Sequence, residues 1–393
     1  MRRVLKWLLI TAVLLVGVAW WVSRVSPPGP FYEPPASVPA TPGALLREEP
    51  FERFVPADAR GWRILYTTTH ADGTPAVDSA VVLAPRTPSP VPQPVLAWAH
   101  GTSGIVPGCA PSILNLDPAR YTPAWTMAPA EGWILVEPDY PGLGTGGIHE
   151  YLIGEAEART TLDAVRAARQ IRGLSVADRT VVWGHSQGGH AAMWTGIVAP
   201  AYAPDVPIAG VAGLAPATDL PALFDAIHRT VGGRVLTALA FASYARAYPD
   251  VRFEDEVRAV ARPIARDIAS RCTYPGVFSQ LEALALGDSI LNGSPASGAF
   301  GRRLAENRPD RPIAAPLFVA QAMADDTITP ALQDAYVARR CAAGQALTYA
   351  RYRERDHMGL VAPDSPLRGD LLQWTRDRFA GTPAPTGCST LQR

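Results

Sequence analysis

A serine between two glycines is the residue of this chain best suited to nucleophilic chemistry. Ser186 lies in Gly184-His-Ser-Gln-Gly188, which matches the pattern G-x-S-x-G. The apolar stretch Thr180–Gly184 precedes it, and a helical stretch beginning at Ala191 follows. In such a strand-turn-helix segment, small flanking residues let strand and helix approach closely and expose the serine hydroxyl. The pattern therefore predicts that Ser186 attacks a carbonyl carbon.

A serine hydroxyl needs a base, and the base needs a carboxylate that orients it. For a serine in this setting, the acid and then the histidine follow along the chain. Of the seven histidines, only His357 comes after the late apolar stretch Pro316–Gln321. Asp325 comes first after that stretch and is the predicted acid, whereas Asp326 is expected to be solvated or to cap a helix. Asp356, beside the histidine, is expected to form a turn.

Acyl transfer also needs donors for the negatively charged oxygen of the tetrahedral intermediate. The backbone N–H of Gln187, directly after the serine, is one predicted donor. The loop 100–104 reads His-Gly-Thr-Ser-Gly, and the amide of Thr102 in it is the second. His185 and His190 flank the serine turn, and we expect them to pack or to make local hydrogen bonds.

The elements that must position these residues alternate between short apolar strands and helices. Such alternation predicts an α/β fold with a mostly parallel sheet flanked by helices. Ala-Asp-Gly-Thr at 71–74 indicates a hairpin between the first two strands. Leu371–Phe379 is expected to close the fold as a helix, and a further helix is expected at Ala158–Ile171. The predicted strands are Trp62–Thr69, Ala76–Leu83, Pro94–His100, Trp133–Asp139, Thr180–Gly184, Ile208–Leu214, Pro316–Gln321 and Leu347–Tyr352.

One long interval, from about residue 217 to 312, breaks this alternation. It contains helical stretches such as Leu220–His228 and Val257–Ala269 and no strand-turn-helix unit. Its position late in the strand order predicts a helical cap over the strand ends. A second structural domain is the alternative.

The N-terminus predicts export. Basic residues at positions 2, 3 and 6 precede the apolar run Trp7–Val22. Residues 1–24 are therefore expected to be a membrane anchor or a cleaved signal, with the anchor favoured, and the membrane is a predicted partner. Residues 25–50, rich in Pro and small residues, are expected to be a linker, and 51–393 to be the catalytic domain. The four cysteines fit two disulfides in an oxidising compartment, and three pairings are open.

Composition and missing motifs exclude several classes of function. Lys plus Arg equals Asp plus Glu at 36 each, so no basic field for nucleic acid exists. No motif with metal-ligand spacing is present, and neither a metal nor a cofactor is expected. Gly142–Gly147 matches G-x-G-x-x-G, but no helix begins directly after it. This segment is expected to form a wall of the active site instead.

With these residues in place, the chain resembles the secretory lipase family, the lipase-A-like branch of the α/β hydrolases. The resemblance implies an α/β-hydrolase fold with a cap inserted before the acid, and no cofactor. It implies hydrolysis of carboxylic esters, either acyl glycerols or simpler ones. It also implies the disulfides Cys109–Cys272 and Cys341–Cys388. Ala322 departs from the glycine usual before the acid. The resemblance rests on Ala97–Ser112, Asp139–Gly144, Gly184–Gly188, Asp325 and His357.

Other functions use the same residues. A Ser-His-Asp set could cleave a peptide or amide, or transfer an acyl group to an alcohol. A membrane-tethered binding protein on an inactive hydrolase fold is a different class, as is a protein of envelope assembly.

Overall fold

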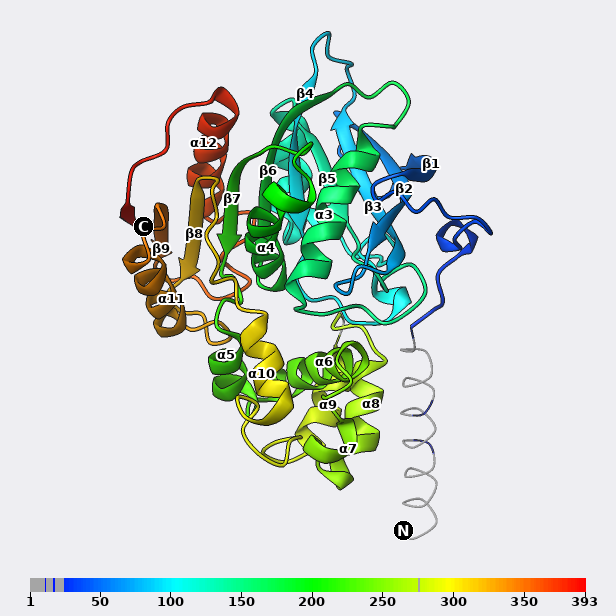
Figure 1. Ribbon diagram of the computed structural model, residues 1–393, viewed down its shortest axis with the longest axis vertical. Coiled ribbons are helices and arrows are strands. Elements are labelled where there is room, and N and C mark those ends of the chain that lie inside the picture. Colours follow the sequence, from blue (N-terminus) through cyan, green and yellow to red (C-terminus); the bar gives the residue numbers. More distant parts are fainter. Residues whose placement is uncertain (1–10, 12–16, 18–24, 275) are drawn as a thin grey trace.

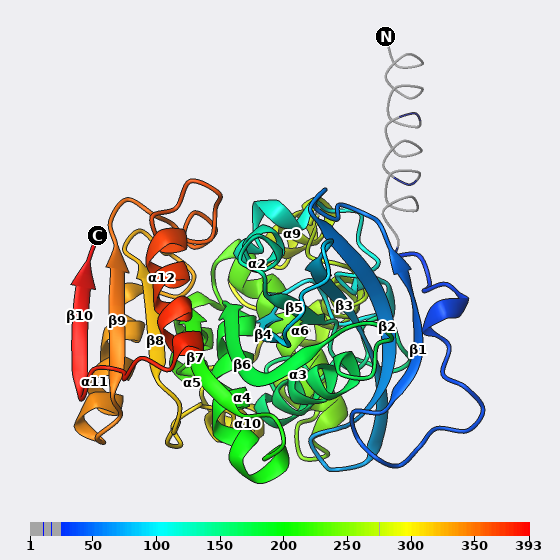
Figure 2. The ribbon, with the colours of Figure 1, turned by 90° about the horizontal axis from the view of Figure 1, so that it is seen from above.

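A ten-stranded sheet forms the centre of the computed structural model, which describes residues 11, 17, 25–274 and 276–393. The strand order is β1-β2-β3-β5-β4-β6-β7-β8-β9-β10 (Figure 2). The pairs β1–β2, β2–β3 and β3–β5 are antiparallel, and all other neighbours are parallel. The strands are β1 (Leu45–Phe51), β2 (Ala59–Thr69), β3 (Pro75–Pro85), β4 (Gln93–Ala99), β5 (Ile134–Pro138), β6 (Val176–His185), β7 (Ile208–Leu214), β8 (Leu317–Ala322), β9 (Leu347–Tyr352) and β10 (Cys388–Gln392).

Helices cover both faces of the sheet because side chains of a strand point alternately to opposite faces. Val95 and Ala97 of β4 pack with α3 (Gly154–Ala168), α4 (Gln187–Tyr202) and α11 (Pro330–Ala342). Leu96 and Trp98 of the same strand belong to the cluster on the opposite face, with α2 (Pro123–Ala130) and α12 (Leu367–Ala380). Both faces of the central strands are buried, as in other parallel sheets. The predicted α/β fold with a mostly parallel sheet is confirmed.

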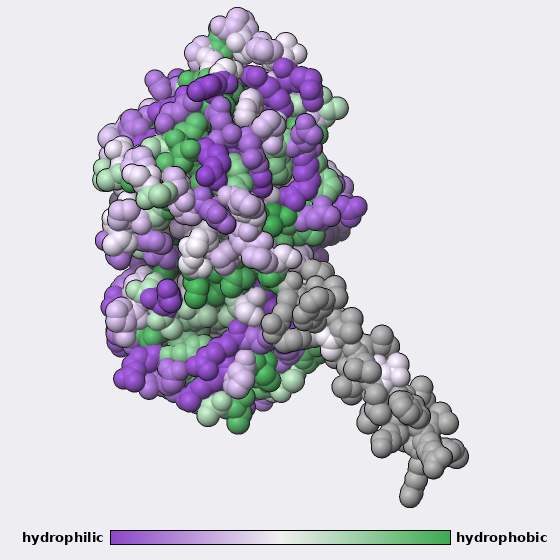
Figure 3. All heavy atoms as spheres, turned by 90° about the vertical axis from the view of Figure 1, so that its right-hand side faces the viewer, coloured by the Kyte–Doolittle hydropathy of each residue, from purple (hydrophilic) through white to green (hydrophobic). Residues whose placement is uncertain are grey.

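Among the described residues, six α-helices between β7 and β8 form a cap below the strand ends in Figure 1. Their apolar core contains Phe241, Tyr244 and Phe300, and it continues into residues 151–156 of the sheet domain. Several large apolar side chains of the cap are exposed, and Figure 3 shows apolar residues over the lower part of one face, where the cap lies. The cap helices are α5 (Leu220–Ile227), α6 (Val231–Ala247), α7 (Phe253–Glu256), α8 (Arg262–Ala269), α9 (Val277–Ala285) and α10 (Gly298–Glu306).

Hydrogen bonds attach the cap to the sheet domain at several places, two of which involve α6 and the residue after α10. In α6, Ser243 Oγ donates to His149 O at 2.9 Å, and the Tyr244 hydroxyl donates to Leu152 O at 2.9 Å. After α10, Asn307 Oδ1 accepts from the amide of Gly154 at 3.0 Å. The backbone oxygen of Asn307 also accepts from Trp194 Nε1 of α4 at 3.0 Å. The cap is thus bonded to the segments that surround the serine turn.

Three sequence predictions need correction. The linker predicted at 25–50 contains a short helix, η1 (Pro30–Tyr32), and most of β1, which pairs with β2. The sequence of β1, Leu-Leu-Arg-Glu-Glu-Pro-Phe, does not alternate, because this edge strand is only partly buried. The helix predicted at Val257–Ala269 begins only at Arg262, because Pro263 favours a helix start and Val257 bridges to Leu291. The chain closes on β10, beyond α12.

The predicted signal or anchor at 1–24 lies outside the described residues, apart from positions 11 and 17. Among the residues that are described, no helix is both long and apolar enough to cross a membrane.

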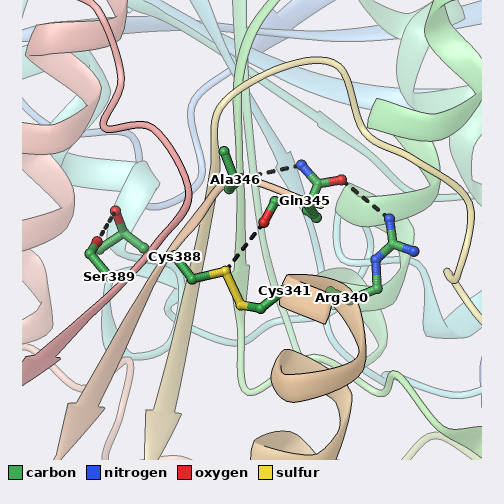
Figure 4. The surroundings of a disulfide bond; sticks show 7 residues. Arg340, Cys341, Gln345, Ala346, Cys388 and Ser389 are labelled. Atoms are coloured by element: carbon green, nitrogen blue, oxygen red, sulfur yellow. Dashed lines mark hydrogen bonds between the residues drawn. A yellow bond between two sulfur atoms is a disulfide. The ribbon is translucent and has the colours of Figure 1, made fainter. Parts of the chain in front are cut away.

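Two disulfides are present, Cys109–Cys272 and Cys341–Cys388, the pairs that the resemblance implied. The first joins the loop after β4 to the cap residue that follows α8. The second joins α11 to β10, and Figure 4 shows Cys388 beside the backbone oxygen of Gln345. It secures the edge strand β10, which otherwise contacts the sheet only through β9. Structural disulfides of this kind indicate an oxidising compartment.

Buried acids make the folded protein sensitive to alkaline pH. Burial raises the pKa of Asp78 to about 8 and that of Asp139 to about 6. An unfolded aspartate releases its proton near pH 3.8, whereas the folded protein holds these protons longer. The free energy of unfolding contributed by such groups is present at low pH and is lost as pH rises through the folded pKa. We expect the wild-type protein to lose about 2 kcal/mol or more between about pH 5 and pH 9.

Asp78→Asn removes one of these protons and is expected to reduce that loss without abolishing it, because burial also raises the pKa of Glu137 to about 8. Urea unfolding of both proteins at the two pH values measures the difference. Only the change in unfolding free energy between the two pH values is compared, so each protein serves as its own reference. Parallel losses in the two proteins would contradict the role of Asp78.

Candidate active site

The turn between β6 and α4 holds Ser186 in a backbone conformation that exposes its hydroxyl. Its φ is +59° and its ψ is −119°, a strained combination for a residue other than glycine. The flanking glycines make the turn fit. A Cβ atom at Gly184 would lie 1.9 Å from Gly188 O, and one at Gly188 would lie 1.9 Å from Ala99 O. No larger residue could replace either glycine without moving a strand or the helix.

Two other predicted residues, His357 and Asp325, meet beside this turn. His357 Nδ1 lies 2.7 Å from Oδ2 of Asp325, and the Asp325 side chain is fully buried. The other oxygen, Oδ1, accepts the amides of Thr327 at 2.9 Å and Ile328 at 2.8 Å. A carboxylate held in this way accepts the Nδ1 proton and leaves Nε2 of the imidazole free to act as a base. Asp326 is exposed, and Asp356 accepts the amide of Gly359 in a turn.

A cavity of about 610 Å³ brings the predicted residues together, because Ser186, His357, Thr102 and Gln187 all line it. Ser186 Oγ and the His357 ring make no hydrogen bond with each other in the described structure. Such catalytic bonds commonly form or tighten only when substrate is present.

The two predicted oxyanion donors are also available. Gln187 is the first residue of α4, where backbone N–H groups have no partner within the helix. Within the described part of the chain, neither this amide nor that of Thr102 donates a hydrogen bond. The positive end of the α4 dipole adds to the attraction for a negative oxygen. The Thr102 hydroxyl is bonded to the hydroxyl of Tyr151 at 2.9 Å.

The histidines that flank the serine make local contacts. His185 Nε2 lies 3.0 Å from the backbone oxygen of His357, and the two rings are 4.5 Å apart. Burial, and then the neighbouring charge of His357, lowers the pKa of His185 well below its usual value. A neutral His185 therefore supports the segment that carries His357. His190 is fully buried and lies 2.9 Å from Oε2 of Glu157.

A comparison with models of protein families assigns the chain to one of them. The family model described as Secretory lipase matches residues 126–387, more than half of the chain. The chain belongs to the secretory lipase family.

Relatives of this protein match most of its length. A Mycobacterium tuberculosis protein, named a probable inactive lipase, is 29% identical over 381 residues, covering 90% of this chain and 82% of its own. Lipase A of Moesziomyces aphidis is 23% identical over 404 residues, covering 93% and 84%. The structure of Candida antarctica lipase A in its closed state superposes with a TM-score of 0.77 at 19% identity, covering 93% of this chain and 89% of that one. This last likeness shows a shared fold.

The structure adds a buried polar network that the sequence did not reveal. Glu157 of α3 is fully buried, and its Oε1 accepts the Gln187 side-chain amide at 2.7 Å and the amide of Leu152 at 3.0 Å. Nδ1 of His190 lies 2.9 Å from the other oxygen of Glu157, Oε2, and Nε2 of His190 lies 2.8 Å from the backbone oxygen of Asn307. The network thus connects the first turn of α4 to the cap. Glu157 looks like an ordinary helix residue in the sequence, because Glu155 and Arg159 lie close to it and nothing marks it out from them.

Proposed function

We propose that this protein is a carboxylic ester hydrolase that forms an acyl-enzyme on Ser186. The observation that supports this most is the strained serine at the β6–α4 turn, facing one cavity together with a histidine that is bonded to a buried aspartate. Membership of a lipase and esterase family agrees with it. Lipid esters or simpler esters are the proposed substrates.

In the proposed mechanism, His357 Nε2 takes the proton of Ser186 as Oγ attacks the ester carbonyl carbon. Asp325 holds the ring and stabilises the imidazolium that forms. The amides of Gln187 and Thr102 donate to the carbonyl oxygen as it becomes negative. When the intermediate collapses, the imidazolium gives its proton to the leaving alcohol. The same base then activates a water molecule, which attacks the acyl-enzyme and releases the acid.

A fluorophosphonate probe tests this function directly, because the activated serine displaces fluoride and keeps the phosphonyl group. We expect stoichiometric labelling of the native protein, and peptide mass spectrometry should find the label on Ser186. Ser103 lines the same cavity and offers a matched control. Ser103→Ala should label like the wild type, whereas Ser186→Ala should not label. A label on another residue would refute the proposed nucleophile.

A second candidate is a binding protein on an inactive hydrolase fold, and the name of the Mycobacterium tuberculosis relative favours it. Absence of labelling, together with absence of ester turnover, would support this candidate. Matched ester and amide substrates, assayed with and without an added alcohol, separate ester hydrolysis from amide cleavage and acyl transfer. We expect hydrolysis of the ester.

The proposed place of action is outside the cytoplasm. The two disulfides and the secretory family agree with secretion. The basic and apolar residues within 1–24 would serve as an anchor or a cleaved signal. N-terminal sequencing of the mature protein from membrane and soluble fractions distinguishes the two.

A further inference from the structure

Two buried polar side chains that line the cavity have no role in the proposed mechanism. Glu137 of β5 is 5% exposed and Trp98 of β4 is 1% exposed, and both contribute to the cavity that contains Ser186. Oε2 of Glu137 and Nε1 of Trp98 are buried and have no hydrogen-bond partner among the residues that the structure describes. Leaving a buried donor or acceptor unpaired costs free energy, so such groups normally mark an absent partner.

The strand register places the two side chains next to each other. β4 and β5 are parallel neighbours, and Ala97 pairs with Val136, which puts Trp98 and Glu137 at the next position. Both therefore point to the same face of the sheet. Together they offer one donor and one carboxyl group to the same small region.

This region lies away from the reacting atoms. Trp98 also pairs with Trp183 of β6, which precedes Ser186 by only a few residues. At about 3.3 Å per residue, the backbone of Trp98 lies roughly 10 Å along the strands from that of Ser186. A bound molecule that touches both places must therefore extend through the cavity.

The walls of the cavity between these places are mostly apolar. Leu114, Leu116 and Pro118 form part of the wall on the side of Glu137. Leu223, Phe224, Ile227, Val235 and Leu236 form the wall that the cap contributes. A polar pair in the wall of a mostly apolar cavity fits a long apolar arm with a polar group at or near its end.

We propose that Glu137 and Trp98 form a subsite for a hydroxyl group carried on one arm of the ester substrate. The inference rests on the proposed function and names the substrate class more closely: a hydroxylated long-chain ester. The hydroxyl oxygen accepts a hydrogen bond from Trp98 Nε1–H, and the hydroxyl group donates its hydrogen to Oε2 of Glu137.

The charges near the subsite favour an uncharged group. Burial, and then the neighbouring charge of Asp139, raises the pKa of Glu137 to about 8. The protonated carboxyl group can both donate and accept at neutral pH. Among the described residues, none of those that line the cavity is Lys or Arg, so a carboxylate on the substrate would find no cation. A hydroxyl group matches both unpartnered atoms.

The test measures kcat/KM for pairs of esters of equal chain length, with and without a terminal hydroxyl group. One pair carries the hydroxyl on the acyl arm and the other on the alcohol arm. We expect wild-type enzyme to prefer the hydroxylated member of one pair by about tenfold or more. The pair that shows the preference identifies the arm that enters the subsite.

Three variants assign that preference to the two side chains. Glu137→Leu and Trp98→Phe should abolish it, and Glu137→Gln should retain part of it because the amide still forms hydrogen bonds. Ser279→Ala, on the cap side of the cavity, should leave it unchanged. The compared quantity is the ratio of the two kcat/KM values measured on one preparation, so partial misfolding affects both substrates equally. Equal turnover within both pairs by wild-type enzyme, or a preference that survives in Glu137→Leu, would overturn the proposal.

A binding measurement separates this proposal from the proposed function. In Ser186→Ala, an α,ω-alkanediol should raise the melting temperature more than the n-alkanol of equal length, and Glu137→Leu should remove the difference. If no ester is hydrolysed but the diol still stabilises selectively, the function fails and the subsite stands. If esters are hydrolysed but the diol and the alkanol act alike, the subsite fails alone.

Discussion

Alanine at position 186 is expected to lower kcat for ester hydrolysis by about 10⁴-fold or more. Ser186 supplies the oxygen that attacks the ester and forms the acyl-enzyme in the proposed mechanism, and alanine cannot replace it. Water attacking in its place would keep only the benefit of the amide donors Gln187 and Thr102 and of substrate binding. Hydrolysis of a chromogenic ester under saturating substrate, followed over hours, measures the residual rate.

The fold should survive this change. The Ser186 side chain makes no hydrogen bond in the described structure, so alanine removes none. The melting temperature should stay within a few degrees of wild type. Adding His357→Ala to the variant should cost little more, because groups that act as a unit are not additive. Substantial turnover by folded Ser186→Ala protein would point to a different nucleophile.

Asparagine in place of Asp325 is expected to lower kcat by about 10³- to 10⁴-fold while leaving KM nearly unchanged. The carboxylate accepts the Nδ1 proton of His357 at 2.7 Å, and this bond sets the tautomer of the ring. An asparagine amide can instead donate to Nδ1, which places the proton on Nε2, where a base is needed. The imidazolium would also lose its compensating charge.

Asp326 is the matched control for this substitution. It is the next residue, it is exposed, and it also lines the cavity, but in the described structure it makes no hydrogen bond with His357. Asp326→Asn should keep kcat within about twofold of wild type. A large loss in Asp326→Asn with little loss in Asp325→Asn would exchange the roles of the two residues.

Much of this site could be predicted because its chemistry demands particular residues in a particular order. The glycines around Ser186 are required by close backbone contacts, so they leave a pattern in the sequence. The apolar runs of β6, β7 and β8 are buried on both faces and are therefore easy to find. Asp325 and His357 follow from the chain order that parallel strands impose.

Other features could not be predicted because long-range contacts create them. The sequences of the partly exposed edge strands β1 and β10 show no clear alternation of apolar and polar residues. The position of β10 is set by its pairing with β9 and by the Cys341–Cys388 bond. Glu157 gains its importance only when α3 packs beside α4. Glu137 sits in an otherwise apolar strand, and only the register with Trp98 gives it a meaning.

The attachments of the cap restrict how a substrate can enter. Thr273, beside the Cys109–Cys272 bond, donates its amide to Ser103 O and its hydroxyl to Thr102 O, each at 2.9 Å. With Ser243 and Asn307, the cap is therefore held at three separate places. A hinge movement of the whole cap would have to break these attachments. We therefore expect substrate to enter through local rearrangement of a segment between these attachments, such as α9, while the loop 100–104 keeps its shape.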